Sequence, residues 1–240
     1  MIPHLWCYTC GMVDNSFSDW EPNLHWDTPC GRSLNKLIDI FKNDYKEDIG
    51  IFLTAGSWFQ MVVDPTEKTK DVDVIICRRG KPGELVPIEN KEIHDSLLAN
   101  GIGYKIENLP LYRTGGVLPY IDVLEPSGLI ISHECTGRAS CTSFDNVSIC
   151  VLHPADWVAM HTPSELQARG RVKRTIKTLK RPTEREYIRA VDDIGNKSIV
   201  LRPRFCDPIP VSIAGYEVKE VLAQIRMEQE LSSKSIGFGI

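Results

Sequence analysis

The sequence lacks the features that mark membrane proteins and secreted proteins. No apolar run approaches the roughly 20 residues that a membrane-spanning helix needs, and the first residues lack the basic segment and long apolar stretch of a secretory signal. Eight cysteines in 240 residues are too few for a dense disulfide framework. We therefore expect a protein that contacts no membrane and lies in the cytoplasm, with the nucleus as the alternative. Reduced thiols are expected at Cys135, Cys141, Cys150 and Cys206, whose spacing matches no metal-ligand pattern.

The sequence also lacks a large charge of one sign, internal repeats and low-complexity tracts. Its formal net charge of -4 gives no global attraction to nucleic acid, so any contact with a polyanion must come from a local patch. An apolar content of 42% and a charged content of 25% are ordinary for a globular protein. A chain of 240 residues can form one sizeable hydrophobic core, or one domain with a smaller appendage.

Apolar spacing predicts an α/β (α+β) fold, with a mixed sheet flanked by helices and a mostly helical C-terminal region. A first helix is expected after Ser33 as its N-cap, because apolar residues recur at helical spacing from Leu34 to Tyr45. Short apolar runs predict buried strands at 51–54, 72–77, 120–124 and 148–152, and residues 78–83 are expected to form a loop. Further helices are expected at 58–63, 94–100, 155–161, 164–180, 185–193 and 218–230. The predicted parts are an N-terminal extension over 1–32, a catalytic domain over 33–152 and a mostly helical region over 153–240.

Three aspartates accompany two of the predicted strands. Asp71 and Asp73 are two residues apart, so on a strand they project to the same face. Asp122 is the only acidic residue of the strand that contains it, and burying a single carboxylate without a partner is costly. Neighbouring carboxylates repel each other unless a cation lies between them, and hard oxygen ligands favour Mg²⁺ or Mn²⁺. If the two strands are adjacent, the three carboxylates can hold two metal ions. The alternative is three separate structural roles, in a turn, at a strand edge and in an ion pair with an arginine.

Gly56 and Ser57 follow a predicted buried strand and precede a short predicted helix. Backbone N–H groups at such a helix start can hold phosphate oxygens. Glycine allows a close backbone approach, and the serine hydroxyl adds a further donor.

Together these motifs resemble the nucleotidyltransferase superfamily, which has the DNA polymerase beta-like fold and includes small nucleotidyltransferase toxins of abortive-infection systems. The family pattern is an apolar strand, Gly-Ser, a short helix, Asp-x-Asp in the next strand and a third Asp further on. Here Gly56-Ser57 is followed by thirteen residues, then by Asp71-Val72-Asp73, and later by Asp122. The match covers about residues 34–125 and, more loosely, the helical region to about 195.

The resemblance implies a two-metal transfer of a nucleoside monophosphate from an NTP, such as ATP, to an acceptor hydroxyl, with release of pyrophosphate. Asp71, Asp73 and Asp122 would hold the metal ions, and Asp122 would accept the proton of the acceptor. Gly56 and Ser57 would hold the β- and γ-phosphates. The acceptor is left open among an RNA end, a protein side chain and a small molecule. The rival interpretation is a catalytically inactive module of this fold that binds a partner protein.

A basic stretch follows the predicted sheet domain. Lys173, Arg174 and Lys177 share one face of a helix, and the resemblance makes Lys173 and Lys177 candidates to contact the triphosphate. A solvated basic face and an RNA-binding patch are the alternatives. The helix after the last strand departs from the smaller family members, because it carries His161 where a lysine is expected.

Four residues near the N-terminus provide two pairs of sulfur or nitrogen ligands. Cys7 and Cys10 form a C-x2-C pair, and His25 and Cys30 follow with a four-residue gap. They are compatible with a structural zinc site. The alternative is unliganded thiols in a tryptophan-rich packing segment.

Overall fold

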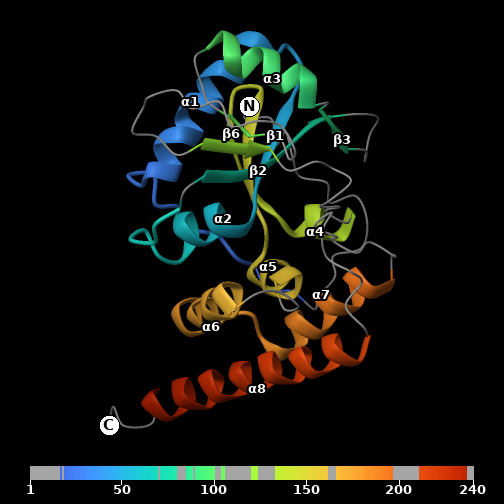
Figure 1. Ribbon diagram of the computed structural model, residues 1–240. Coiled ribbons are helices and arrows are strands. Elements are labelled where there is room, and N and C mark those ends of the chain that lie inside the picture. Colours follow the sequence, from blue (N-terminus) through green and yellow to red (C-terminus); the bar gives the residue numbers. More distant parts are fainter. Residues whose placement is uncertain are drawn as a thin grey trace. The chain divides into compact units, whose positions relative to one another are not determined.

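The structure of the protein, a computed structural model, describes residues 17, 19–69, 71–79, 85–88, 90–100, 104–105, 120–123, 133–161, 166–196 and 211–236. The chain divides into two compact units (Figure 1). Unit 1 comprises residues 1–13, 20–129 and 136–152, and unit 2 comprises residues 14–19, 130–135 and 153–240.

Unit 1 contains one mixed sheet, and its described strands run in the order β4-β5-β2-β1-β7-β6, with β3 paired to β2. The strands are β1 (Ile49–Leu53), β2 (Asp71–Arg79), β3 (Leu85–Pro87), β4 (Tyr104–Lys105), β5 (Tyr120–Val123), β6 (Ser140–Phe144) and β7 (Val147–Val151). β1 is antiparallel to β2 and parallel to β7, whereas β2 is parallel to β5. Every residue of β1 and β7 is buried, as expected for short apolar runs in the centre of a sheet.

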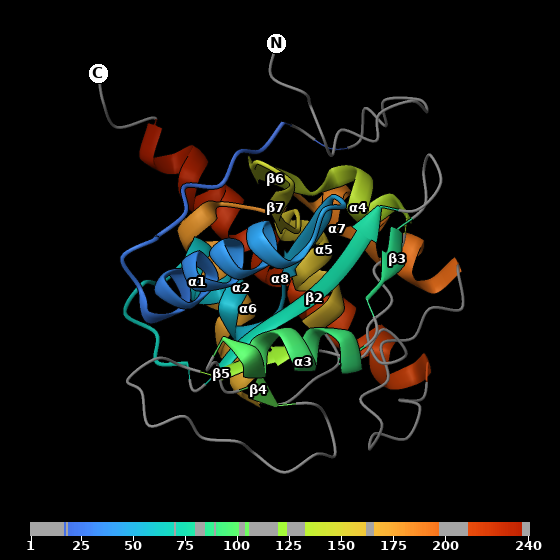
Figure 2. The same ribbon diagram turned by 90° about the horizontal axis from the view of Figure 1, so that it is seen from above.

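Helices flank this sheet. The described helices of unit 1 are α1 (Pro29–Asp44), α2 (Ala55–Val62) and α3 (Asn90–Ala99), and α4 (His133–Arg138) lies where the chain passes between the units. α1 packs on β2 and β7, and α2 packs on β2 (Figure 2). The predicted mixed α/β arrangement with a mixed sheet flanked by helices is therefore confirmed.

The first helix begins earlier than the sequence predicted. Thr28 is its N-cap and accepts a hydrogen bond from the Gly31 N–H at 3.0 Å, and Pro29 occupies the first helical position, where its missing N–H costs nothing. Ser33 therefore lies inside α1 and is buried, so its assignment as the N-cap was wrong.

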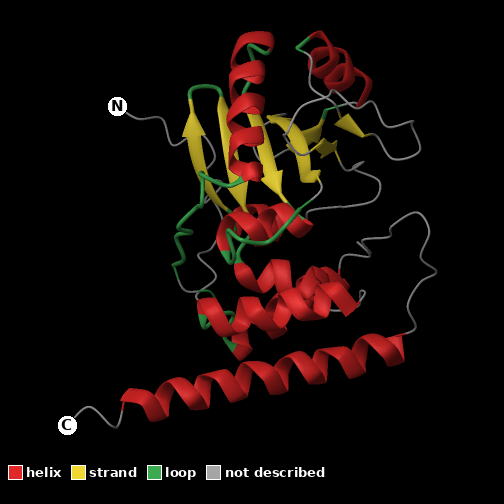
Figure 3. Cartoon of the chain, turned by 60° about the vertical axis from the view of Figure 1, so that its left-hand side comes forward, coloured by secondary structure: helices red, strands yellow, loops and turns green. Residues whose placement is uncertain are grey.

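The described secondary structure of unit 2 consists of helices joined by loops (Figure 3). Besides the start of α4, it contains α5 (Pro154–His161), α6 (Leu166–Leu179), α7 (Glu184–Asn196) and α8 (Val211–Ile236). α5 packs on α6 and α7, and both of these helices contact α8. Among the described helices of the whole chain, none combines the length and the apolar composition that crossing a membrane would require.

Two further predictions were wrong in detail. Arg78 and Arg79 were assigned to a loop but form the end of β2, where they pair with β3. Cys141 and Cys150 were expected to be reduced, but they form a disulfide between β6 and β7. The antiparallel register makes these two residues direct Cα partners, 4.2 Å apart. Cys135 is buried and forms no disulfide, and its Sγ donates to Asp156 Oδ1 at 3.3 Å. Cys206 lies outside the described residues.

Candidate functional site

Strand pairing brings the three predicted aspartates into one small region of the sheet. Asp71 and Asp73 lie at the start of β2, and Asp122 lies in β5. The strands are parallel, with Asp73 paired to Asp122 and Asp71 paired to Tyr120. Because alternate positions of a strand share a face, positions 71, 73 and 122 fall on one face of the sheet. The structure describes Asp71 and Asp122 by their backbone, and Asp73 together with its side chain.

A tight turn connects β1 to α2 beside these positions. Ala55 has a φ of 39°, which is unusual for a residue with a Cβ and identifies a constrained backbone. Gly56 and Ser57 lie in the first turn of α2, and both are buried. The sequence predicted this helix from residue 58, but it begins three residues earlier.

The turn holds Asp73 at three points. The Thr54 N–H donates to the Asp73 carbonyl at 3.2 Å, and the Gly56 N–H donates to the Asp73 carboxylate oxygen Oδ2 at 3.1 Å. The Asp73 N–H donates to Ser57 Oγ at 2.6 Å. The two groups that were predicted to hold phosphate are thus both bonded to Asp73 in this structure.

A buried thiol lies behind the turn. Cys30 of α1 is fully buried, and its thiol is hydrogen-bonded to the Ser57 hydroxyl. Burial raises the pKa of the Cys30 thiol to about 12; the Ser57 hydrogen bond opposes this shift, and the charge of Asp73 adds to it. The Cys30 N–H donates to Gln60 Oε1 at 3.1 Å, which fixes the start of α1 to α2. Sequence reasoning did not connect Cys30 with Ser57, because the two residues are 27 positions apart and meet only when α1 packs on α2.

The donor chemistry of this region fits a hard divalent cation, because the residues that share the sheet face carry carboxylate oxygens. Among the side chains that the structure describes, no three His, Cys, Asp or Glu residues form a cluster. Asp73 is the one member of the predicted trio within that search. Its carboxylate is half-buried, next to the N-terminus of α2.

The predicted phosphate-binding lysines lie in unit 2. Lys173 and Lys177 are exposed on α6, and neither pairs with a described acidic residue. Their proposed contact with the triphosphate stays a prediction. The nearby Lys180 and Arg181, in contrast, are paired with Glu228 at 3.1 Å and Glu186 at 3.2 Å.

His161 does not replace the lysine that the family resemblance would place near the end of α5. Its ring stacks on Trp157, and its Nδ1 lies 2.7 Å from the Trp157 carbonyl oxygen. A carbonyl oxygen can only accept, so Nδ1 carries the proton. Burial lowers the pKa of His161 to about 4, and Arg171 contributes in the same direction. The ring is therefore neutral at physiological pH and supplies no positive charge to a phosphate.

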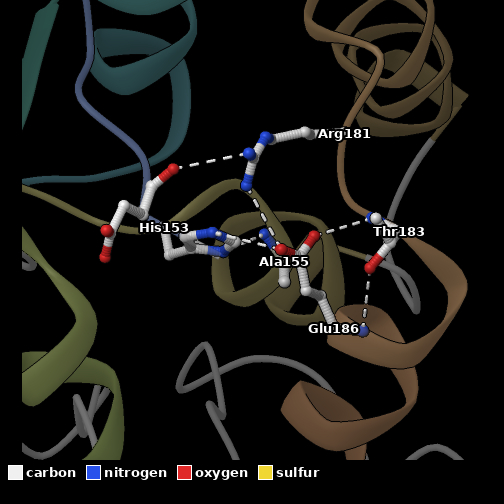
Figure 4. Close-up of polar contacts among 6 residues, drawn as sticks. His153, Ala155, Arg181, Thr183 and Glu186 are labelled. Carbon is white, nitrogen blue, oxygen red and sulfur yellow. Dashed lines mark hydrogen bonds and ion pairs between the residues drawn. The ribbon is translucent and has the colours of Figure 1, made fainter. Parts of the chain in front are cut away.

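Sequence reasoning missed a buried polar cluster in unit 2 (Figure 4). Glu186 is 1% exposed, accepts from Arg181 and from the Thr183 N–H at 2.8 Å, and lies 4.0 Å from His153 Nε2. The Thr183 hydroxyl accepts from the Glu186 N–H in return, which completes a capping box at the start of α7. His153 Nδ1 accepts from the Ala155 N–H at 3.1 Å and so caps α5. The Thr-x-x-Glu pattern was the available signal in the sequence, and it indicates a helix start rather than catalysis.

The four candidate zinc ligands are only partly described. Cys7 and Cys10 lie outside the described residues. His25 precedes α1, and its N–H donates to the Met61 carbonyl at 2.9 Å. Cys30 faces Ser57, as described above. Zinc binding by this segment stays a prediction.

No model of a known protein family matches the chain. A search of curated proteins gives no significant match either.

Proposed function

We propose that the protein is a metal-dependent nucleotidyltransferase that moves a nucleoside monophosphate from an NTP to an acceptor hydroxyl. One observation carries this proposal. Parallel pairing of β2 with β5 sets Asp73 beside Asp122, two residues from Asp71, next to the tight turn at the start of α2. If the three aspartates had unrelated structural roles, their positions would not need to be adjacent.

The three aspartates would bind the metal ions in the proposed reaction, and Asp122 would also accept a proton. Asp71, Asp73 and Asp122 would hold two Mg²⁺ or Mn²⁺ ions. Such ions, when bound, neutralise the triphosphate and the leaving pyrophosphate and lower the pKa of the acceptor hydroxyl. The acceptor oxygen attacks the α-phosphorus, and the bond from that phosphorus to the bridging oxygen of pyrophosphate breaks. The Asp122 carboxylate takes the proton that the acceptor hydroxyl loses.

The proposal is tested by incubating the purified protein with each α-labelled NTP, with Mg²⁺ or Mn²⁺, and with a panel of acceptors. The panel comprises total RNA, a protein mixture and a set of polyhydroxylated small molecules. We expect label to enter one acceptor class. Replacing Asp71 and Asp73 by Asn should lower the rate by about a thousandfold or more, because charge stabilisation of the transition state is lost.

The matched control is Asp39→Asn with Asp192→Asn, which removes the same charge from exposed helix positions. This variant should keep full activity, and circular dichroism should show the native fold for both double variants. The proposal is wrong if no acceptor is labelled and if NTP with Mg²⁺ leaves the melting temperature unchanged. That result would favour an inactive module that binds a partner protein.

A further inference from the structure

The Ser57 hydroxyl is hydrogen-bonded inside the protein. Its side chain is fully buried, and Oγ accepts the N–H of Asp73 at 2.6 Å. The hydroxyl also bonds to the thiol of Cys30. Oγ has a second lone pair and an O–H left for this contact, and the Cys30 thiol can donate or accept. The hydroxyl thus joins β2 to α1 through α2.

These contacts restrict Asp73 more tightly than an ordinary strand residue. Ser57 fixes its N–H, Thr54 fixes its carbonyl, and the Gly56 N–H fixes one carboxylate oxygen. Backbone and side chain are therefore positioned together from a single turn. Residues that orient a metal ligand in this way affect metal affinity although they do not touch the ion.

We propose that Ser57 is a positioning residue that holds Asp73 for divalent metal binding, rather than a ligand of the triphosphate. This inference rests on the proposed function, because it requires Asp73 to be a metal ligand. It differs from the role that the family resemblance implies for Ser57. Gly56 shares the new role through its N–H.

The test is the binding of Mn²⁺ to the purified protein without nucleotide, measured through the electron paramagnetic resonance signal of free Mn²⁺. We expect Ser57→Ala to raise the Kd for Mn²⁺ by about 10- to 100-fold, the range for loss of a group that orients a metal ligand. In turnover assays, kcat of Ser57→Ala should be lower than that of the wild type, and a higher metal concentration should be needed for half-maximal activity. KM for the NTP at saturating metal should stay within about twofold of wild type, because a positioning residue gives the triphosphate no binding energy of its own.

Ser33→Ala is the matched control. Ser33 is also a buried serine of unit 1, but its hydroxyl has no hydrogen-bond partner among the described atoms. This variant should bind Mn²⁺ as the wild type does. If Ser57→Ala does not fold, Ser57→Cys replaces it, because it keeps the size of the side chain with a weaker acceptor atom. An increase in Kd for Mn²⁺ is expected there too.

The outcomes separate this inference from the proposed function. Wild-type protein that binds no Mn²⁺ and transfers no nucleotide contradicts both. If the wild type binds Mn²⁺ and turns over, while the Ser57 variants bind Mn²⁺ equally well and have a raised KM for the NTP, then Ser57 contacts the triphosphate. The positioning role is then wrong, and the nucleotidyltransferase proposal stands.

Discussion

Burial is the main influence on the chemistry of two thiols in unit 1. The pKa values of Cys30 and Cys77 are both raised to about 12, and loss of solvation is the largest cause at each residue. At neutral pH both are therefore neutral thiols. A neutral buried thiol is a poor nucleophile, so neither residue is a candidate for covalent catalysis.

The raised pKa values predict a loss of stability in alkaline solution. Both thiols keep their protons in the folded state to about pH 12, whereas the unfolded chain releases them near 9. The stabilising contribution is thus complete below pH 9 and is lost as the pH rises toward 12. Each thiol should lower the free energy of unfolding by up to about 1.4 kcal/mol per pH unit in that window. Urea unfolding between pH 8 and 11 measures the slope.

The control for this prediction is Cys77→Ala, which removes one of the two thiols. The variant should be less stable at pH 8 because of the lost packing, but its free energy of unfolding should fall less steeply with pH. Equal slopes for the variant and the wild type would show that Cys77 does not titrate as described.

The residues of the candidate site could be identified in the sequence, whereas their contacts could not. Asp71, Asp73 and Asp122 stood out because carboxylates beside apolar strands are unusual. The hydrogen bond from the Asp73 N–H to Ser57 Oγ could not be predicted from the sequence. The two residues are 16 positions apart, and the bond depends on how α2 packs on β2. A contact between the Ser57 hydroxyl and a phosphate was equally consistent with a serine at this position.

At the scale of elements, apolar runs predicted the four strands that lie at internal positions of the described sheet, β5, β2, β1 and β7. β1 and β7 are mostly apolar, every residue in them is buried, and both were predicted. β6 reads Ser-Cys-Thr-Ser-Phe, has no buried residue and was missed. An exposed edge strand is defined by its pairing partner rather than by its own pattern.

The start of α1 depends on a close backbone approach at Gly31. A Cβ built on Gly31 would lie 2.2 Å from the Trp26 carbonyl oxygen, far inside van der Waals contact. Gly31→Ala should therefore destabilise the protein by about 1–3 kcal/mol, although alanine is the better helix former by about 1 kcal/mol. Thermal or urea unfolding of the variant measures this loss.

Gly170 in α6 provides the opposite case. A Cβ at this position meets no atom within 4 Å, and the residue is exposed in the helix interior. Gly170→Ala should therefore raise the free energy of unfolding of unit 2 by up to about 1 kcal/mol, because helix propensity acts alone. If both glycine variants change stability in the same direction, the close approach at Gly31 is not the cause of its effect.

At the scale of the whole molecule, the disulfide shows what linear spacing cannot reveal. Cys141 and Cys150 are nine positions apart, a separation that fits no ligand motif. Only the β6–β7 hairpin register makes them direct partners. The expectation that Cys141 and Cys150 are reduced was wrong because it considered only their spacing along the chain. Whether two cysteines can form a disulfide depends on their pairing across the strands.

The distribution of charge is also a property of the whole chain. The formal net charge is -4, yet α6 contains no acidic residue and carries Arg169, Arg171, Lys173, Arg174 and Lys177. Its inner side is buried through Val172, Thr175 and Ile176. Lys173 and Lys177 are therefore on the solvent side, one helical turn apart.

This concentration of positive charge predicts salt-dependent binding of a polyanion by α6. Each phosphate neutralised on a single-stranded nucleic acid contributes about -0.7 to the slope of log Kobs against log salt concentration. For a labelled single-stranded RNA, Lys173→Ala with Lys177→Ala should weaken binding and make the slope shallower by about 1.4. Fluorescence anisotropy over a salt series measures both. Lys36→Ala with Lys46→Ala removes the same charge from exposed positions of unit 1 and should leave the slope unchanged. An equal effect of the two double variants would mean that only net charge matters, and that α6 carries a solvated basic face.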